Sequence, residues 1–401
     1  MDKFNNIILQ MHSLVIFRNL LDCKVIHKFL CLLESMPKNT AAQVSQYACF
    51  ASELFKSNNN LTKYIRDCVL KDENIYIRKI AANEEVDSEI EKCLRRELNI
   101  LEELSRIEAP EITQHINYNG YLPVWKTSNI NLNVEYYTRA EKISRHGYGI
   151  YSESHMFTFR DGIITPVKHP DTTNLHCLKG YEDERQSVID NTLVLLKGGP
   201  ATNVLLYGDA GTGKSSTVKA VANEFKDRGL RIIEIRKNQL ESIPAIREEI
   251  EDNCLKFILF IDDLSFTKNS DEFGILKAIL EGSITANPVN SVIYATSNRR
   301  HLIKESFSDR NGDDIHVNET IQELASLSER FGLTVCFSRP DKCRYLDIVK
   351  ELAKDYKIDI DPETLEQSAE RYALLRGGRS PRIAKQLIEN IVGQKEYLFQ
   401  E

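Results

Sequence analysis

One short segment constrains the fold of this chain more than any other. Residues Gly208–Ser215 read GDAGTGKS and match the pattern G-x-x-x-x-G-K-[ST]. The segment follows an apolar run and precedes a helical pattern, which is the context that a phosphate-binding loop requires. Its glycines let backbone N–H groups curl around phosphate oxygens, and the following helix directs its positive end at the same anion. The sequence therefore predicts a phosphate site formed by Gly208, Asp209, Ala210, Gly211, Thr212, Gly213, Lys214, Ser215 and Ser216.

Five short apolar runs predict the strands around this loop. They are rich in β-branched or aromatic residues and lack polar alternation: Val204 to Tyr207, Leu230 to Ile235, Phe257 to Ile261, Val292 to Thr296 and Leu333 to Phe337. Continuous apolar strands separated by helical patterns indicate strands buried on both faces. We therefore predict an α/β fold in which a P-loop parallel five-stranded sheet carries helices on both faces.

The pattern of the remaining residues divides the chain into four parts. Residues 1–110 predict a helical N-terminal domain, in which 86–107 carries an amphipathic stripe of Ile90, Leu94, Leu98, Leu101 and Leu104. Residues 111–175 are rich in aromatic side chains and predict a connector that packs on its neighbours. The core that carries the phosphate-binding loop would span 176–340. Three helical patterns without a strand predict a C-terminal helical lid over 341–401.

Composition excludes several other classes of protein. Hydrophobic residues make up 42% and charged residues 28%, which excludes a disordered tail, a collagen-like fibre and a coiled-coil rod. No apolar stretch reaches the roughly 18 residues of a membrane span. The run from Ile7 to Phe17 lacks the marks of a signal peptide, so we expect a cytoplasmic protein without a membrane partner. A net charge of −7 provides no global attraction for nucleic acid.

The nine cysteines are an odd number and include no C-x-x-C pair. This spacing favours reduced thiols over a disulfide framework or a zinc site. We expect most of them to be buried.

Polar residues at the ends of two predicted strands extend the phosphate site. Lys214 would reach the β- and γ-phosphates of a nucleotide, and the Ser215 hydroxyl would ligate Mg²⁺. Asp262 follows the third predicted strand and would help to hold Mg²⁺, with Asp263 orienting or activating the attacking water. Asn298 follows the fourth predicted strand and would hold that water from the other side. The alternative for the two aspartates is a cap on the next helix.

Together these motifs resemble those of the AAA+ ATPases over about residues 176–401. The resemblance implies that Gly180 and Tyr181, in the run Leu178–Glu182, border the adenine, and that Asn298 is the sensor-1 residue. Ser328–Gly332 resembles the box that supplies an arginine finger to a neighbouring subunit, which would be Arg330. Gly378–Ala384 resembles the sensor-2 helix, with Arg382 facing the nucleotide. The resemblance thus implies ATP and Mg²⁺ as cofactors and a homo-oligomer.

A closer resemblance is to an uncharacterised bacterial family of predicted AAA-type ATP-binding proteins. It is carried by the runs Pro200–Gly208, Asp262–Phe266 and Ala295–Leu302, and it extends upstream to about Tyr137. The basic residues Arg299, Arg300 and His301 in the last run are expected to serve in loop packing.

One residue departs from the AAA+ pattern, and one missing pattern indicates which nucleobase is bound. Asp263 is one methylene shorter than the usual glutamate, which favours slow turnover because general-base help is typically worth 10²–10⁴-fold in rate. The guanine-reading pattern [NT]-K-x-D is missing, because Thr267–Asp271 has one residue too many, so adenine is the expected base.

Three functions remain open at this point. The first is an ATPase that assembles and remodels a protein or nucleic-acid client, with the N-terminal helical domain binding the client or an adaptor. The second is an ATP-dependent switch or loader that hardly turns over and controls partner binding. The third is a small-molecule kinase. No feature of the sequence specifically supports a nucleic-acid partner.

Overall fold

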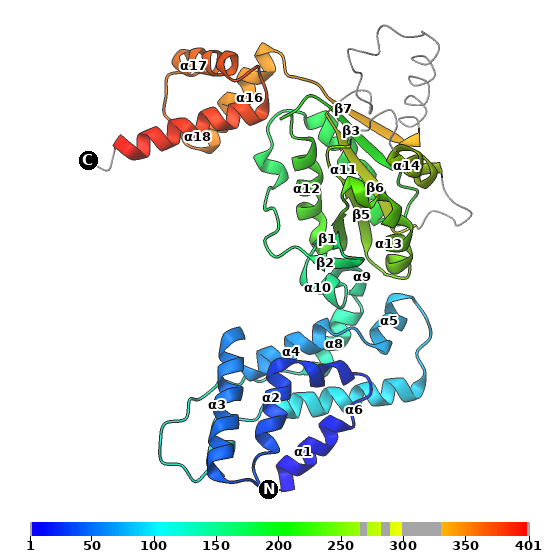
Figure 1. Ribbon diagram of the computed structural model, residues 1–401, viewed down its shortest axis with the longest axis vertical. Coiled ribbons are helices and arrows are strands. Elements are labelled where there is room, and N and C mark those ends of the chain that lie inside the picture. Colours follow the sequence, from blue (N-terminus) through cyan, green and yellow to red (C-terminus); the bar gives the residue numbers. More distant parts are fainter. Residues whose placement is uncertain (1, 265–270, 282–288, 299–329, 399–401) are drawn as a thin grey trace. The chain divides into compact units, whose positions relative to one another are not determined.

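The computed structural model describes residues 2–264, 271–281, 289–298 and 330–398. The chain forms two compact units, Met1–Glu153 and Ser154–Glu401, and Figure 1 shows the elements of each. The first unit is helical. The second contains the sheet and the phosphate-binding motif.

The first unit consists of short and medium helices, as the sequence predicts for its first part. Their bounds are α1 Asp2–His12, η1 Arg18–Asp22, α2 Lys24–Leu33, α3 Thr40–Ser57, α4 Leu61–Lys71, α5 Ile75–Ala81, α6 Ser88–Ser105, α7 Ala109–Thr113, α8 Leu132–Ala140, α9 Ile143–His146 and α10 Ile150–Glu153. Side chains of four asparagines start helices in this unit by accepting a backbone N–H of the first turn: Asn39, Asn60, Asn74 and Asn131.

The amphipathic stripe predicted within 86–107 is confirmed in α6. Leu94, Leu98, Leu101 and Leu104 are fully buried, while Ile90 near the start of the helix is half-buried. Burial of each leucine contributes about 1.5–3 kcal/mol relative to exposure. This face of α6 therefore supplies much of the apolar contact that holds the first unit together.

The aromatic segment after residue 110 packs on the helices, as expected. The Trp125 ring lies 4.9 Å from the Phe50 ring, edge to face, and its Nε1–H donates to the Ile107 carbonyl at 3.0 Å. A buried indole needs such an acceptor because an unpaired N–H costs free energy. Tyr118 and Tyr121 are the exposed exceptions, at 47% and 86%.

The second unit is built on a sheet with strand order β2-β1-β4-β5-β6-β3-β7. The strands are β1 Met156–Arg160, β2 Ile163–Pro166, β3 Val204–Gly208, β4 Leu230–Glu234, β5 Lys256–Ile261, β6 Ser291–Ser297 and β7 Leu333–Phe337. The five predicted strands are β3 to β7, and all their pairings are parallel. The predicted count of five is wrong, because β1 and β2 from the presumed connector extend the sheet to seven strands.

The two additional strands form a hairpin. β1 pairs in parallel with β4 and antiparallel with β2, and residues Asp161 and Gly162 turn between them with positive φ. These strands are only four or five residues long and lie among the aromatic residues of the segment, so the sequence pattern did not predict them. The backbone of β1 covers the edge of β4, and Phe157 and Ile164 of the hairpin are buried.

Burial differs between the central strands and β7. Every residue of β6 is buried, as expected for a strand covered on both faces. In β7 the buried Val335 and Phe337 alternate with the exposed Thr334 and Cys336. This edge strand is therefore covered on one face only.

The thiols are less buried than the sequence predicts. All nine cysteines are free, as expected, but none is fully buried, and Cys49, Cys177, Cys336 and Cys343 are exposed.

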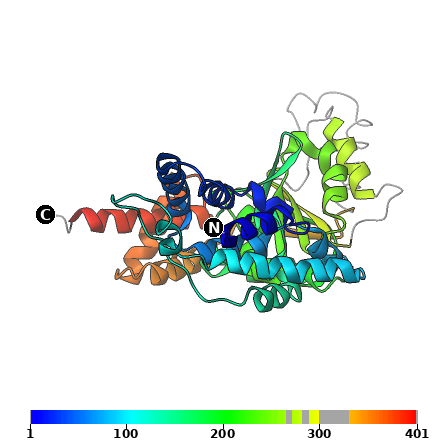
Figure 2. The ribbon, with the colours of Figure 1, turned by 90° about the horizontal axis from the view of Figure 1, so that it is seen from below.

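Helices cover both faces of the sheet, with α12 on one side and α13 and α14 on the other (Figure 1). The helices of the second unit are η2 Leu175–Cys177, α11 Glu182–Leu196, α12 Lys214–Phe225, η3 Lys226–Arg228, η4 Lys237–Ser242, α13 Ile243–Ile250, α14 Asp271–Glu281, α16 Lys342–Asp355, α17 Pro362–Leu375 and α18 Pro381–Leu398. The last three pack against one another at one end of the unit, and Figure 2 shows them from a second direction.

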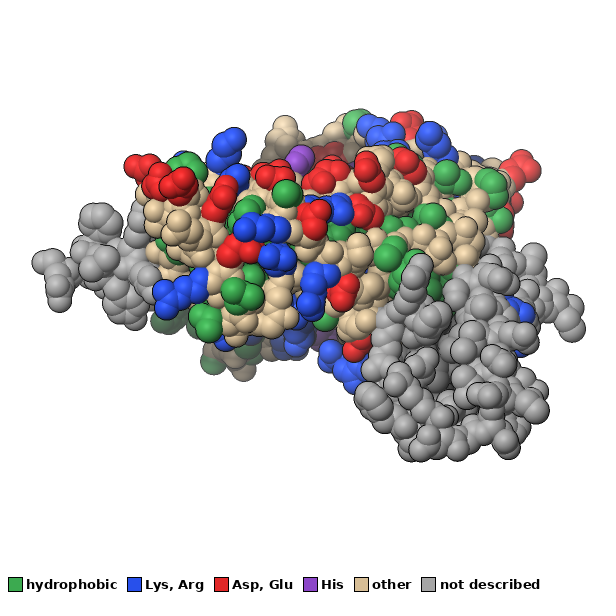
Figure 3. Space-filling view, turned by 90° about the horizontal axis from the view of Figure 1, so that it is seen from above, with side chains coloured by type: hydrophobic (Ala, Val, Ile, Leu, Met, Phe, Trp, Pro, Cys, Tyr) green, Lys and Arg blue, Asp and Glu red, His purple; other side chains and the backbone are tan. Residues whose placement is uncertain are grey.

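The division into four parts stays a prediction. The segment 111–175 contributes helices as far as α10 to the first unit and the β1–β2 hairpin to the second. Within the described ranges, no helix is long and apolar enough to cross a membrane. On the face drawn in Figure 3, acidic and basic side chains are interspersed over the residues that the structure describes.

The hairpin gives a test of where the second unit begins. A fragment of residues 154–401 should unfold cooperatively. A fragment of 176–401 lacks Phe157, Ile164 and the strand that pairs with β4, so its free energy of unfolding should be roughly 4 kcal/mol lower or it should not fold. Urea denaturation followed by circular dichroism measures the difference. Equal stability of the two fragments would contradict the structural role given to the hairpin.

Candidate functional site

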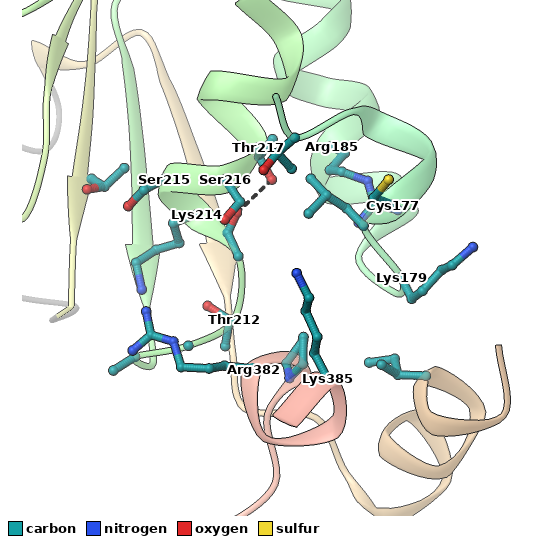
Figure 4. Close-up of a pocket in the computed structure, with 18 of the residues that line it drawn as sticks. Cys177, Lys179, Arg185, Thr212, Lys214, Ser215, Ser216, Thr217, Arg382 and Lys385 are labelled. Atoms are coloured by element: carbon teal, nitrogen blue, oxygen red, sulfur yellow. Dashed lines mark hydrogen bonds between the residues drawn. The ribbon is translucent and has the colours of Figure 1, made fainter. Parts of the chain in front are cut away.

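A cavity of about 650 Å³ lies in the second unit, where β5 and β6 end and α12 and α18 begin. Polar side chains from separate elements meet in it (Figure 4). Its lining comprises Thr172, Thr173, Cys177, Leu178, Lys179, Arg185, Ala210, Gly211, Thr212, Gly213, Lys214, Ser215, Ser216, Thr217, Asp262, Asp263, Thr296, Asn298, Ile348, Leu352, Pro381, Arg382 and Lys385.

The loop between β3 and α12 forms the floor of this cavity. Gly208 has φ +132°, and a Cβ there would overlap the Phe337 carbonyl oxygen, so the β3–β7 contact admits only glycine at this position. Gly213, with φ +97°, precedes the first turn of α12. Asp209 shapes the loop from outside the lining, because its carboxylate accepts the Arg339 N–H at 2.8 Å.

Lys214 is the buried cation of the loop. It is 5% exposed, and its Nζ donates to the carbonyls of Gly208 at 3.0 Å and Asp209 at 2.7 Å. Burial lowers the pKa of Lys214, against the opposing effect of nearby Asp209, Asp263 and Asp262. An ammonium with so little water around it gains strongly from an anion beside it.

The Asp262 carboxylate is the point where three elements meet. Its Oδ1 accepts hydrogen bonds from the Ser215 hydroxyl of α12 and the Thr296 hydroxyl of β6, each at 2.6 Å. The Asp263 N–H approaches the same oxygen at 3.1 Å and the Thr296 Oγ1 at 3.0 Å. These interactions fix the carboxylate at the end of β5, beside the start of α12.

These oxygens fit a hard divalent cation such as Mg²⁺, which prefers carboxylate and hydroxyl ligands and keeps several water molecules. Ser215 and Asp262 would hold it. No cluster of three His, Cys, Asp or Glu that could bind a metal occurs among the residues that the structure describes. Ser215 and Asp262 would fill only part of the coordination shell, as is usual for Mg²⁺ bound with phosphates.

Asp263 and Asn298 form the second polar pair at the sheet edge. The Asn298 Nδ2 donates to the Asp263 Oδ1 at 2.7 Å, and both residues are exposed. Asp263 has φ +53°, a backbone conformation that non-glycine residues adopt rarely and mostly at functional or constrained positions. The pair lies in the lining of the cavity, where the sequence predicts a water-holding site.

The start of α18 approaches the loop from the opposite side. The Arg382 N–H donates to the Gly211 carbonyl at 3.2 Å, so this helix is in direct contact with the loop. Figure 4 shows the side chains of Arg382 and Lys385 directed from α18 toward the cavity. The structure thus brings together Lys214, Ser215, Asp262, Asp263, Asn298 and Arg382 from the predicted site.

Gly180 and Tyr181 do not line the cavity. Tyr181 is fully buried, its ring stacks on Phe337 at 5.3 Å, and its hydroxyl donates to the Ser338 carbonyl at 2.6 Å. Burial raises the pKa of Tyr181 to about 12. From this segment the neighbouring Leu178 and Lys179 take part in the lining.

Arg330 also lies outside the lining. It is half-buried and closely precedes the edge strand β7. The Ser328–Glu329 start of its motif and the basic residues 299–301 lie outside the described residues.

Some lining residues were missed in the sequence. Lys385 follows Arg382 by three positions, and this helical spacing could have indicated a shared face. Thr296, two positions before Asn298, was noted only as part of the strand. Thr172 and Thr173 carry no sequence signal, because only the fold brings their segment to the cavity.

A family model described as "Protein of unknown function (DUF815)" matches residues 152–395, more than half of the chain. The chain belongs to this family. The matched range begins close to the start of the second unit. The relation expected from the sequence, to an uncharacterised family of the AAA+ type, is confirmed.

Two curated proteins are similar to parts of this DUF815 protein. "Replication factor C subunit 5" of Arabidopsis thaliana is 23% identical over 228 residues, which are 50% of this chain and 60% of that protein. "26S proteasome regulatory subunit 4 homolog" of Dictyostelium discoideum is 37% identical over 70 residues, 16% of each chain. The chain thus spans less than two thirds of the length of either relative.

Solved structures with a similar chain include the RuvB Holliday junction branch migration motor of Thermotoga maritima. It is 19% identical, with a TM-score of 0.40, and the match covers 56% of this chain and 66% of that one. A single-residue mutant of the same protein gives 18% identity and a TM-score of 0.40 over the same shares of the two chains.

The hydrogen bonds of Thr296 predict an effect on stability. Thr296→Val keeps the shape of the side chain but removes a donor to Asp262 and the acceptor of the Asp263 N–H. The free energy of unfolding should therefore fall by about 1–3 kcal/mol, whereas Thr296→Ser should lose about 1 kcal/mol or less. Urea denaturation of the ligand-free protein measures both. A loss for serine as large as the loss for valine would contradict the dominant role given to the hydroxyl.

Proposed function

We propose that this DUF815 protein is a Mg²⁺-dependent ATPase that remodels a protein or nucleic-acid client. The observation that carries the proposal is the convergence of six side chains in one cavity: Lys214, Ser215, Asp262, Asp263, Asn298 and Arg382. Two hydroxyl or amide donors, two carboxylates and two cations beside the carboxyl ends of parallel strands and the starts of α12 and α18 suit a nucleoside triphosphate and its metal.

The phosphate chain would lie against the first turn of α12. The N–H groups of Gly211–Ser216 and the positive end of the helix favour anionic oxygens there. Lys214 would exchange its two loop carbonyls for phosphate oxygens. Arg382 would contact the terminal phosphate from α18 and so couple the C-terminal helices to the nucleotide. Bound Mg²⁺ would neutralise developing charge on the phosphate oxygens.

Asp263 and Asn298 would act on the attacking water. Their side chains are already hydrogen-bonded to each other, so a water molecule at this pair would meet one acceptor and one donor. Asp263 would accept the proton of the water, and Asn298 would orient it. The short Asp263 side chain favours slow turnover, because general-base help depends on hydrogen-bond reach.

Arg330 would complete the active site of a second copy. Since it lies outside the cavity lining of its own chain, a role as an arginine finger requires a neighbour, and we therefore propose a homo-oligomer. The helical N-terminal domain, residues 1–110, would bind the client or an adaptor, and residues 341–401 would act as a lid. A cytoplasmic location belongs to the same proposal.

A second function is favoured by the Asn298–Asp263 hydrogen bond. It holds the proposed base at 2.7 Å from an amide, and the side chain is shorter than the usual glutamate. An ATP-dependent switch or loader with very slow hydrolysis would use this arrangement. Nucleotide binding would then strengthen the existing contact between α18 and the loop and change which partner is bound.

ATPase activity measured against protein concentration distinguishes the two functions. If sites are completed between subunits, the rate per chain should rise with concentration and reach a plateau. Lys214→Ala should abolish activity and weaken ATP binding at least about 100-fold, because a buried charge beside the phosphates is lost. A flat rate near zero despite tight ATP binding would favour the switch. Loss of neither binding nor activity in Lys214→Ala would contradict both.

Arg330→Ala should lower the rate by about 10³-fold or more and leave ATP binding intact. The matched control is Arg371→Ala, an exposed arginine on α17, which should have the activity of the parent.

Mixing two inactive variants tests whether Arg330 acts on a neighbour. Chains with Arg330→Ala keep an intact cavity, and chains with Asp263→Asn keep the arginine. In a random equal mixture about a quarter of the sites should combine both, so roughly a quarter of the parent activity should return. No recovery in a mixture that co-assembles would exclude the arginine finger.

A further inference from the structure

The cavity extends beyond the phosphate loop to a wall that the AAA+ motifs do not describe. Thr172, Thr173 and Cys177 line it from the segment before α11, and Ile348 and Leu352 line it from α16. The phosphate-binding end is formed by the first turn of α12. A group attached to phosphates bound at that end would lie along this wall.

One side chain of α12 holds the wall in place. The Asn223 Nδ2 donates to the carbonyl oxygens of Asp171 at 2.9 Å and Thr173 at 2.7 Å. Both hydrogens of the amide are thus used on the two carbonyls that flank Thr172. A second bond within the segment, from the Thr173 N–H to the Asp171 carboxylate at 2.8 Å, fixes the turn.

The remaining atom of the amide is paired as well. The Asn223 Oδ1 lies 2.7 Å from the Nε2 of His155, just before β1. Since the amide nitrogen is committed to carbonyls, its oxygen must accept, and His155 must carry its proton on Nε2. Burial lowers the pKa of His155, which favours the neutral ring. The hydrogen bonds that link His155, Asn223 and the carbonyls of Asp171 and Thr173 therefore have one consistent set of donors and acceptors.

We propose that the segment Asp171–Thr173 contacts the nucleoside part of the bound nucleotide, and that Asn223 is the positioning residue that sets this contact. The inference rests on the proposed ATP site. The same helix that holds the phosphates at its first turn holds the nucleoside wall at its third turn, so one rigid element fixes the distance between both ends of the ligand. Leu178, Ile348 and Leu352 supply apolar surface beside the wall for a flat base.

Asn223→Asp tests the proposal because it keeps an oxygen for His155 but turns the donor that faces the two carbonyls into an acceptor. Calorimetry should show the dissociation constant of Mg·ATP rising about tenfold, while that of Mg·tripolyphosphate, which has no nucleoside, stays unchanged. Asn223→Ala removes the donor without adding charge and should change the two constants in the same selective way.

The matched control is Asn191→Asp on α11. Its Nδ2 also donates to a backbone carbonyl, that of Thr202 at 2.9 Å, but neither residue lines the cavity. This variant should bind both ligands like the parent. Thermal unfolding of all variants checks that they are folded.

The outcomes separate this inference from the proposed function. A loss of Mg·ATP binding that Mg·tripolyphosphate does not share supports the positioning role. An equal loss for both ligands, no loss for either, or a parent that binds Mg·ATP no more tightly than Mg·tripolyphosphate overturns it and leaves the phosphate site standing. A parent that binds neither ligand overturns the proposed function and this inference together.

Discussion

The structure of the second unit depends on the set of hydrogen bonds around the Asp262 carboxylate. One carboxylate oxygen accepts hydrogen bonds from the hydroxyls of Ser215 on α12 and Thr296 on β6. The adjacent Asp263 N–H donates to the same oxygen and to the Thr296 hydroxyl. Without these donors, a partly buried carboxylate would be costly to keep at the end of β5. The same bonds fix the position of the phosphate loop relative to two central strands. Packing and the proposed chemistry therefore depend on the same set of hydrogen bonds.

The C-terminal helices join this centre through a few direct contacts. Arg382 donates its N–H to Gly211, and the Arg344 guanidinium of α16 lies 4.2 Å from the centre of the Tyr181 ring while pairing with Glu184 at 3.0 Å. A cation over an aromatic ring and a charged pair are interactions of moderate strength. They add to apolar burial, because side chains of these helices such as Ile348 and Leu387 belong to the same buried cluster as the sheet.

The first unit has its own internal anchor. The buried Glu97 of α6 accepts the backbone N–H groups of Val15, Ile16 and Phe17 at 2.8 to 3.2 Å. This carboxylate satisfies a turn between α1 and η1 that would otherwise leave buried donors unpaired. The first unit is thus held by a polar contact as well as by the leucines of α6.

The sequence by itself determined the local parts of this protein. Val204 to Tyr207, the loop Gly208–Ser215 and the following helix could be predicted because strand, glycine turn and helix start are short-range patterns. The free thiols and the leucine face of α6 also followed from residue types and spacing, and the AAA+ relation followed from the resemblance of the motifs to a known family. Asp262 and Asn298 were located because parallel strands bring their carboxyl ends to one edge of a sheet.

Only the tertiary structure decided which distant segments meet. The strands Met156–Arg160 and Ile163–Pro166 lie among aromatic residues and are too short to show a period, and pairing with β4 makes them part of the sheet. Tyr181 packs on Phe337 inside the core although its motif suggested a ligand. Asn223 reaches the carbonyls of Asp171 and Thr173 across about fifty residues of sequence. Such contacts join residues that are distant in the sequence and depend on the tertiary fold, so no local pattern of residue types predicts them.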